Sequence, residues 1–336
     1  MTKKAIVLAP RTDSVLRRTD RYNAIAKELG GEIEFVIVDS DGDFEDIVKA
    51  SEGGIAVTTP AYRQLRKGIV NDIAKRVPTL KLLQASSAGT DTFDKVALAE
   101  LGVAVANHGG GNAVAVAEHA IALMVAVYRK LDKQIDFVRA GKWNSQMSNY
   151  PESEYRTLVG KKVGIIGLGQ IGSRIAKRLR GWECEVMFTD VASFDAEYVE
   201  ATGARRTDLD TLLSTSDVVS LNVPLGTTTR HMLSDLQFGQ MKPTAIVINT
   251  ARGPVIDEKA LVRALNERKI FGAGLDVIEK EPIVADNPLL GMDNVIITPH
   301  QATKALESEL NIRRFVVENI RRLARGEPIT SVVLPN

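Results

Sequence analysis

The chain has 336 residues, enough for about two domains that each bury an apolar core. Hydrophobic residues make up 44% and charged residues 25%, which is typical of globular proteins and excludes a collagen, a coiled coil and a largely disordered chain. The 43 Lys and Arg residues nearly balance the 42 Asp and Glu residues, so the formal net charge is +1. No overall electrostatic field therefore favours nucleic acid or an anionic membrane as a partner.

Cysteine and membrane signals are sparse. The single cysteine, Cys184, excludes an intrachain disulfide and a zinc site built from several cysteines, so we predict no metal and read Cys184 as structural. The first apolar run ends at Pro10, at strand length rather than signal-peptide length. The most apolar stretch, 113–127, is interrupted by Glu118 and His119 and is too short for a bilayer. We therefore expect a cytoplasmic protein with no membrane partner.

Short apolar runs alternate with helical segments along the chain, as strands buried on both faces of a parallel sheet do. The first third is predicted to hold strands at 4–9, 35–39, 54–59, 80–86 and 103–107. A second series is predicted at 163–167, 185–190, 218–223, 245–251, 272–277 and 295–300. The fold class is therefore α/β, with two doubly wound parallel-sheet domains.

A glycine-rich loop, 108–112, separates the two series and is the first predicted hinge. A long helix is expected to begin near Ala113, with Asn112 as its N-cap. The final helix, about 305–325, is expected to pack back on the first sheet, with a second hinge just after residue 300. The predicted domains are therefore 1–107 with 304–336, and 108–303.

The strongest local motif is a dinucleotide-binding fingerprint. An apolar strand runs into Gly167, Gly169 and Gly172 at the G-x-G-x-x-G spacing, which allows a tight turn, close approach of a pyrophosphate and close helix packing. The next strand ends at Asp190, 18 residues after Gly172, where a carboxylate can bind the ribose 2′-hydroxyl of NAD and repel a 2′-phosphate. No arginine occurs in 191–193, so NAD is favoured and NADP less so.

Three polar side chains are predicted at strand ends of the second sheet, where ligands of open α/β sheets bind. Arg252 follows the strand 245–251, Glu281 lies past 272–277, and His300 closes 295–300. Separately, Arg252 could cap a helix or pair with Asp257, His300 could be a structural histidine, and Glu281 could be a solvated loop charge. Together they provide an anion-binding fork, a proton donor and an anion to orient that donor, which a dehydrogenase acting on a 2-oxo acid needs.

At these residues the sequence resembles the D-isomer-specific 2-hydroxyacid dehydrogenases over nearly its whole length. The matching segments are Ser87–Asp91, Ala117–Ala120, Gly164–Gly172, Thr250–Gly253, Leu275–Val277 with Glu281-Pro282, and Thr298–His300. The resemblance implies a flavodoxin-like substrate domain, a Rossmann NAD-binding domain, a cleft between them and a homodimer formed through the NAD-binding domain.

The resemblance also implies roles for individual residues. Arg252 would bind and polarise the substrate, His300 would be the acid/base and Glu281 its partner. Backbone amides at Ser87, Ala88 and Gly89 would hold the substrate carboxylate, and Asp276 would meet the nicotinamide carboxamide. The expected cofactor-binding set is Gly167, Gly169, Gln170, Ile171, Gly172, Asp190, Pro224, Thr250 and Asp276.

Three segments depart from the family's usual pattern. Trp182–Cys184 replaces a glycine-containing turn before the strand that ends at Asp190, whereas Ser87–Gly89 and Gln301–Ala305 concern the substrate pocket. They leave the acid open among hydroxypyruvate, glyoxylate, 3-phosphoglycerate and similar compounds. Two other readings remain open at this point: a relative that acts on a non-carboxylate substrate such as phosphite, and a non-catalytic protein that senses NAD.

Overall fold

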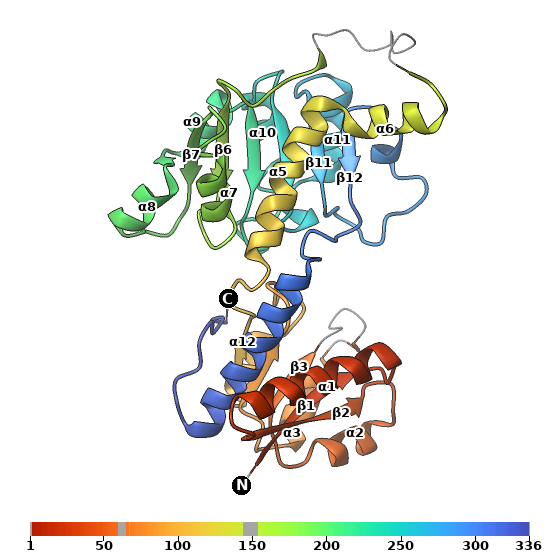
Figure 1. Cartoon of the computed structure of the whole chain (residues 1–336), viewed down its shortest axis with the longest axis vertical. Coiled ribbons are helices and arrows are strands. Elements are labelled where there is room, and N and C mark those ends of the chain that lie inside the picture. The colour runs from red at the N-terminus through yellow and green to blue at the C-terminus, as the bar shows by residue number, and fades with distance from the viewer. Residues whose placement is uncertain (1, 60–64, 67, 144–153, 336) are drawn as a thin grey trace. The chain divides into compact units, whose positions relative to one another are not determined.

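The computed structural model describes residues 2–59, 65–66, 68–143 and 154–335. The chain divides into two compact units, Met1–Asn112 with Ala305–Asn336, and Ala113–Lys304. Each unit is built on a parallel sheet, so the predicted α/β class with two doubly wound sheets is confirmed. Figure 1 labels most of the elements named below.

Unit 1 contains a five-stranded parallel sheet of described residues, in the order β2-β1-β3-β4-β5. Its strands are β1 (Lys3–Ala9), β2 (Ile33–Asp39), β3 (Gly54–Thr59), β4 (Leu82–Ala85) and β5 (Ala104–Ala106). Its helices are α1 (Asp13–Glu28), α2 (Phe44–Ser51), α3 (Ile69–Arg76), α4 (Lys95–Glu100) and α12 (Leu306–Arg325). The order of strands reverses direction between β1 and β3, as in doubly wound folds.

The C-terminal helix α12 belongs to the core of unit 1. Val316, Val317 and Ile320 are fully buried in the same apolar cluster as residues of β1 and α1. The buried Asn319 Nδ2 donates to Gln84 Oε1 on β4 at 2.6 Å. Residues separated by more than 200 positions in sequence therefore form one core (Figure 1).

The glycine-rich loop also packs on α12. A Cβ on Gly109 would lie 2.4 Å from the Phe315 ring, and one on Gly111 would lie 2.9 Å from Ile312. Close packing is therefore a reason for glycine at these positions, and the predicted hinge stays a prediction. The predicted N-cap is wrong, because the buried Asn112 Oδ1 accepts no hydrogen bond from any described residue.

Unit 2 contains a seven-stranded parallel sheet of described residues, in the order β12-β11-β10-β9-β6-β7-β8. Its strands are β6 (Lys162–Ile166), β7 (Glu185–Thr189), β8 (Arg205–Arg206), β9 (Val218–Leu221), β10 (Ile246–Asn249), β11 (Gly272–Leu275) and β12 (Val295–Ile297). Its helices are α5 (Ala113–Arg129), α6 (Leu131–Arg139), α7 (Gly172–Leu179), α8 (Ala196–Thr202), α9 (Leu209–Thr215), α10 (Asp235–Gln240) and α11 (Glu258–Asn266), with 3₁₀ helices η4 (Gly253–Val255) and η5 (Pro288–Gly291).

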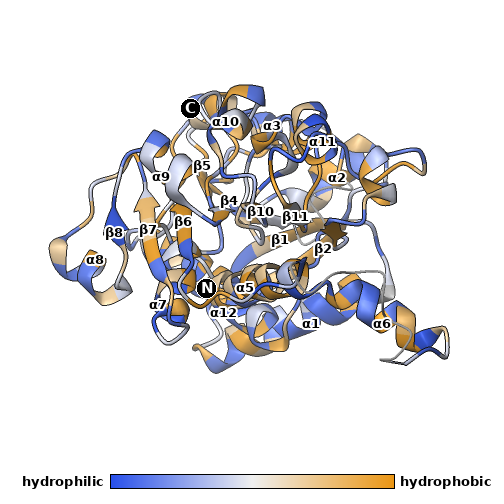
Figure 2. Cartoon of the chain, turned by 90° about the horizontal axis from the view of Figure 1, so that it is seen from above, coloured by the Kyte–Doolittle hydropathy of each residue, from blue (hydrophilic) through white to orange (hydrophobic). Residues whose placement is uncertain are grey.

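Two apolar layers cover the faces of this sheet. One lies under α5 and α7 and includes Met124, Ile175 and Phe188; the other lies under α10 and α11 and includes Phe238 and Leu261. Strands β6 and β7 are largely apolar, whereas the edge strand β8 is hydrophilic (Figure 2). No helix in the described ranges is long and apolar enough to cross a membrane.

Candidate active site

The glycine motif forms the turn between β6 and α7. Gly167 has φ +94°, and a Cβ there would lie 2.6 Å from the Asn222 carbonyl oxygen. A Cβ on Gly172 would lie 2.0 Å from the Gly167 carbonyl oxygen, whereas one on Gly169 would meet no described atom within 4 Å. The fold itself therefore requires the first and third glycines, and the second borders open space.

The carboxylate of Asp190 is fixed beside this turn. Its Oδ2 accepts the Leu168 N–H at 2.7 Å, and its Oδ1 accepts the Ala192 N–H at 2.8 Å. Arg206, which the sequence analysis did not single out, donates from Nη1 to the Asp190 carbonyl oxygen at 2.8 Å. Its guanidinium carbon lies 5.0 Å from the centre of the Phe188 ring. The pairing of β8 with β7 brings this arginine to Asp190.

These residues fit a dinucleotide. The glycine turn leads into the N-terminus of α7, where the positive end of the helix dipole is a favourable place for phosphate. Gly169 leaves room for close approach, and a carboxylate stands at the end of the neighbouring strand. The other members of the predicted set lie at strand ends or in this turn: Gln170, Ile171, Pro224, Thr250 and Asp276.

His300 and Glu281 are directly paired. The two Glu281 carboxylate oxygens lie 2.8 and 3.1 Å from His300 Nδ1. Their side chains are one-quarter exposed, 25% for His300 and 24% for Glu281, so both remain accessible. A carboxylate at Nδ1 holds that nitrogen as the protonated one, which leaves Nε2 as the ring atom for proton exchange.

Arg252 lies in a braced turn after β10. Asn249 donates from Nδ2 to the Arg252 carbonyl oxygen at 3.0 Å and accepts the Ala251 N–H at 3.0 Å. A Cβ on Gly253 would lie 1.7 Å from the Ile278 carbonyl oxygen, so this turn packs directly on the segment that follows β11. Because β10, β11 and β12 are adjacent and parallel, Arg252, Glu281 and His300 follow the carboxyl ends of neighbouring strands.

The predicted carboxylate-binding residues lie in unit 1. Ser87, Ala88 and Gly89 follow β4, and Ser87 Oγ donates to the Gly89 carbonyl oxygen at 2.7 Å. Their proposed role therefore concerns the carboxyl end of the first sheet.

Comparisons with known proteins identify the family. Residues 121–302 match the family model "D-isomer specific 2-hydroxyacid dehydrogenase, NAD binding domain". A D-3-phosphoglycerate dehydrogenase from Archaeoglobus fulgidus is 39% identical over 262 residues, which cover 78% of this chain and 49% of that protein. A glycerate dehydrogenase from Methylorubrum extorquens is 33% identical and covers 98% of both chains.

The chain belongs to the D-isomer-specific 2-hydroxyacid dehydrogenase family. A solved glyoxylate reductase from Paecilomyes thermophila has the same fold, with a TM-score of 0.84, 28% identity and 99% coverage of both chains. The chain spans about half the length of the Archaeoglobus protein and nearly all of the other two. The family inferred from the motifs is thus confirmed, and with it an oxidoreductase of 2-hydroxy acids that uses a nicotinamide cofactor.

Proposed function

We propose that this chain reduces a small 2-oxo acid to the D-2-hydroxy acid with NADH, and also catalyses the reverse oxidation. The observation that carries the proposal is the contact between His300 Nδ1 and the Glu281 carboxylate at 2.8 Å, on the sheet that also bears the glycine turn. The substrates in the names of the relatives, glyoxylate, glycerate and phosphoglycerate, are the first acids to test.

In this proposal each side chain has a defined task. The bound nicotinamide would supply or accept the hydride. His300 donates its Nε2 proton to the carbonyl oxygen during reduction and recovers it from the hydroxyl during oxidation, so hydride and proton together balance the reaction. Ionised Glu281 orients the imidazole and stabilises its protonated form. Arg252 binds the carboxylate and polarises the carbonyl group through its fork of donors.

We assign the substrate carboxylate to the loop that follows β4 in unit 1. Backbone N–H groups of Ser87, Ala88 and Gly89 are suited to a carboxylate because successive amides after a strand form an anion-binding nest. In this assignment, residues 1–107 with 304–336 form the substrate domain and 108–303 the NAD-binding domain, bounds that differ by a few residues from those of the two compact units, Met1–Asn112 with Ala305–Asn336 and Ala113–Lys304.

We propose that NAD is preferred over NADP. The Asp190 carboxylate is held 2.7 Å from the glycine-turn N–H of Leu168, where it would accept from a ribose hydroxyl and repel a 2′-phosphate. The guanidinium of Arg206 donates to the Asp190 carbonyl oxygen, and its positive charge would weaken that repulsion. We therefore expect a preference for NADH with measurable use of NADPH.

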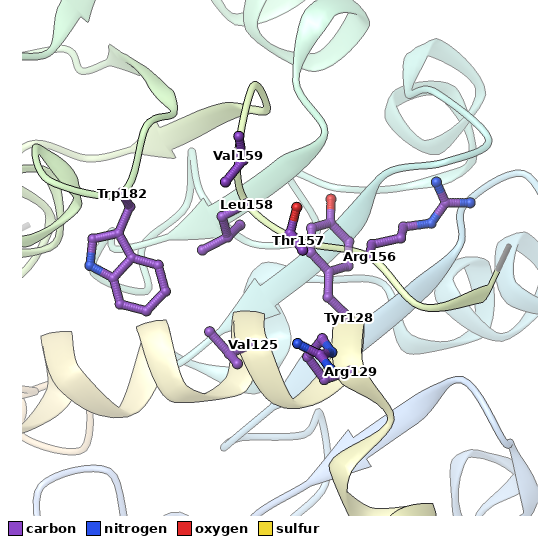
Figure 3. Close-up of a pocket in the computed structure, with 8 residues that line it drawn as sticks. All are labelled: Val125, Tyr128, Arg129, Arg156, Thr157, Leu158, Val159 and Trp182. Atoms are coloured by element: carbon purple, nitrogen blue, oxygen red, sulfur yellow. The ribbon is translucent and has the colours of Figure 1, made fainter. Parts of the chain in front are cut away.

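We also propose a homodimer through the NAD-binding domain. Leu131, Ile135 and Val138 form one stripe of α6 and are 38%, 49% and 53% exposed, and α6 buries none of its described side chains. Tyr128 and Trp182 help to line a largely apolar cavity of about 190 Å³, where Val125 projects from α5 toward Leu158 (Figure 3). Exposed apolar surface of this kind favours association with a second copy.

The deciding experiment is a spectrophotometric screen at 340 nm. Glyoxylate, hydroxypyruvate, pyruvate and 3-phosphohydroxypyruvate are offered with NADH and with NADPH, and phosphite is offered with NAD. Oxidation of NADH by at least one 2-oxo acid, lost in His300→Ala, supports the proposal. Binding of NADH without turnover of any acid would instead favour an NAD-sensing protein.

The cytoplasm remains the expected compartment.

A further inference from the structure

Helix α5 crosses β11 with a matching repeat. A Cβ on Gly272 would lie 3.2 Å from Val127, and one on Gly274 would lie 3.1 Å from Leu123. The helix contacts recur every four residues, about 6 Å along its axis, and the strand contacts every two residues, about 6.7 Å. Four residues before Leu123 the helix carries His119, and two residues after Gly274 the chain carries Asp276, directly after β11. The same spacing therefore places His119 over Asp276.

His119 and Asp276 are joined through a hydroxyl group. His119 Nε2 lies 2.9 Å from Thr298 Oγ1, and Thr298 Oγ1 lies 2.6 Å from Asp276 Oδ1. The direct distance from His119 Nε2 to Asp276 Oδ1 is 3.6 Å. The Asp276 side chain is 2% exposed, whereas that of His119 is 27% exposed.

The direction of these hydrogen bonds follows from the groups themselves. A threonine hydroxyl has one hydrogen, and the buried Asp276 carboxylate can only accept it. The Thr298 oxygen must then accept from the imidazole, so Nε2 of His119 carries a proton. His119 therefore donates to Thr298, and Thr298 donates to Asp276.

Asp276 in turn holds the backbone at the candidate catalytic histidine. Its Oδ1 also accepts the Gln301 N–H at 2.9 Å, its Oδ2 accepts the Ala302 N–H at 2.9 Å, and its carbonyl oxygen accepts the His300 N–H at 2.8 Å. His300 has φ +55°, a left-handed conformation that a non-glycine residue keeps only when its surroundings hold it there. The orientation of the Asp276 carboxylate therefore helps to fix the backbone from which the His300 side chain projects.

We propose that His119 is a positioning residue: its Nε2–H, acting through Thr298, fixes the Asp276 carboxylate and thereby the backbone that carries His300. His119 acts only through these two groups and exchanges no proton with substrate. The kinetic consequence rests on the proposed 2-oxo acid reductase function.

The kinetic test compares His119→Gln with His119→Leu. The glutamine amide keeps a hydrogen-bond donor at a similar distance from the backbone, whereas leucine keeps only the approximate volume of the side chain. We expect His119→Leu to lower kcat about tenfold, the effect of a lost hydrogen bond to a network that ends on a charge, and to change KM for the acid less than about twofold. His119→Gln should retain most of kcat. Glu118→Gln, on the exposed side of the same helix turn, is the control and should behave as the wild type.

A double-mutant cycle tests the connection to Thr298. Thr298→Val removes the hydroxyl, and Thr298→Ser restores it. If one chain of hydrogen bonds is involved, His119→Leu combined with Thr298→Val should be no worse than the poorer single variant. Additive losses, or a His119→Gln enzyme as slow as His119→Leu, would overturn the proposal.

A second readout does not depend on activity. Hydrogen exchange should show that the Gln301 and Ala302 amides lose protection in His119→Leu and keep it in His119→Gln. The chain contains four histidines, so imidazole ¹⁵N signals can be assigned by single substitutions, and we expect a proton on His119 Nε2. Unchanged protection in His119→Leu, or an unprotonated Nε2, refutes the positioning role. If these results hold while no 2-oxo acid is reduced, the proposed function alone has failed.

Discussion

Two glycines of the same turn should respond in opposite ways to a single methyl group. A Cβ on Gly172 would lie 2.0 Å from the Gly167 carbonyl oxygen, whereas ordinary contact begins near 3.4 Å, so the turn and α7 must separate by about 1.4 Å. We expect Gly172→Ala to cost about 1–3 kcal/mol of stability, as overpacking typically does. For a unit of this size, that is a decrease in Tm of roughly 3–10 °C.

Gly169→Ala is the matched variant. Its Cβ would meet no described atom within 4 Å, and its backbone lies outside the left-handed region, so we expect a stability change within about 0.5 kcal/mol. If a pyrophosphate approaches this backbone, the methyl group should weaken NADH binding at least about tenfold. Circular dichroism melting measures the first quantity, and NADH fluorescence titration the second.

The two variants separate a failure of the cofactor assignment from a failure of the steric argument. Wild-type NADH affinity in Gly169→Ala would refute the assignment of this turn to the cofactor. Wild-type melting of Gly172→Ala would refute the steric argument. Loss of both stability and binding in Gly169→Ala would show that the apparent open space is needed by the fold.

Three further predictions follow from described contacts. Glu281→Gln keeps the shape of the His300 partner but removes its charge, so reduction should slow about 10²-fold or more, while NADH titrations remain unchanged; equal rates would remove Glu281 from the mechanism. Ile135→Glu places a charge in the exposed stripe of α6 and should convert a dimer into monomers in analytical ultracentrifugation; a dimer that persists would exclude this face. Arg325 and Arg321 hold the pKa of Glu32 below its usual range, so their contribution to stability is present above about pH 4.3 and lost as the pH falls further. Glu32→Gln should therefore lower the urea midpoint more at pH 7 than at pH 3, and an equal decrease at both values would contradict the ion pair.

The apolar runs were sufficient to predict both sheets, because strands buried on two faces must be apolar throughout. The two-residue strand Arg205–Arg206 was missed because an exposed edge strand needs no apolar residues. Arg206 was therefore missed as a neighbour of Asp190, although the two residues are only 16 positions apart.

At the candidate site, the residue types were predictable and the arrangement of their contacts was not. The motifs predict that Glu281 and His300 lie together, and the structure pairs them. They meet because β11 and β12 are adjacent and parallel, so the loops that follow them reach the same edge of the sheet. The connection from His119 to Asp276 depends on how closely a helix approaches a strand. That distance is set by two glycines in β11, whose significance appears only once the packing partner is known.

The fully buried α12 residues Val316, Val317 and Ile320 affect the order in which the protein can be assembled during translation. Unit 2 is one continuous segment and can fold as soon as residue 304 has left the ribosome. The first sheet is made earliest but lacks part of its apolar cover until α12 emerges, so its strands wait longest for their final partner. A frameshift or proteolytic cut near residue 305 would therefore unfold unit 1 and leave unit 2 folded.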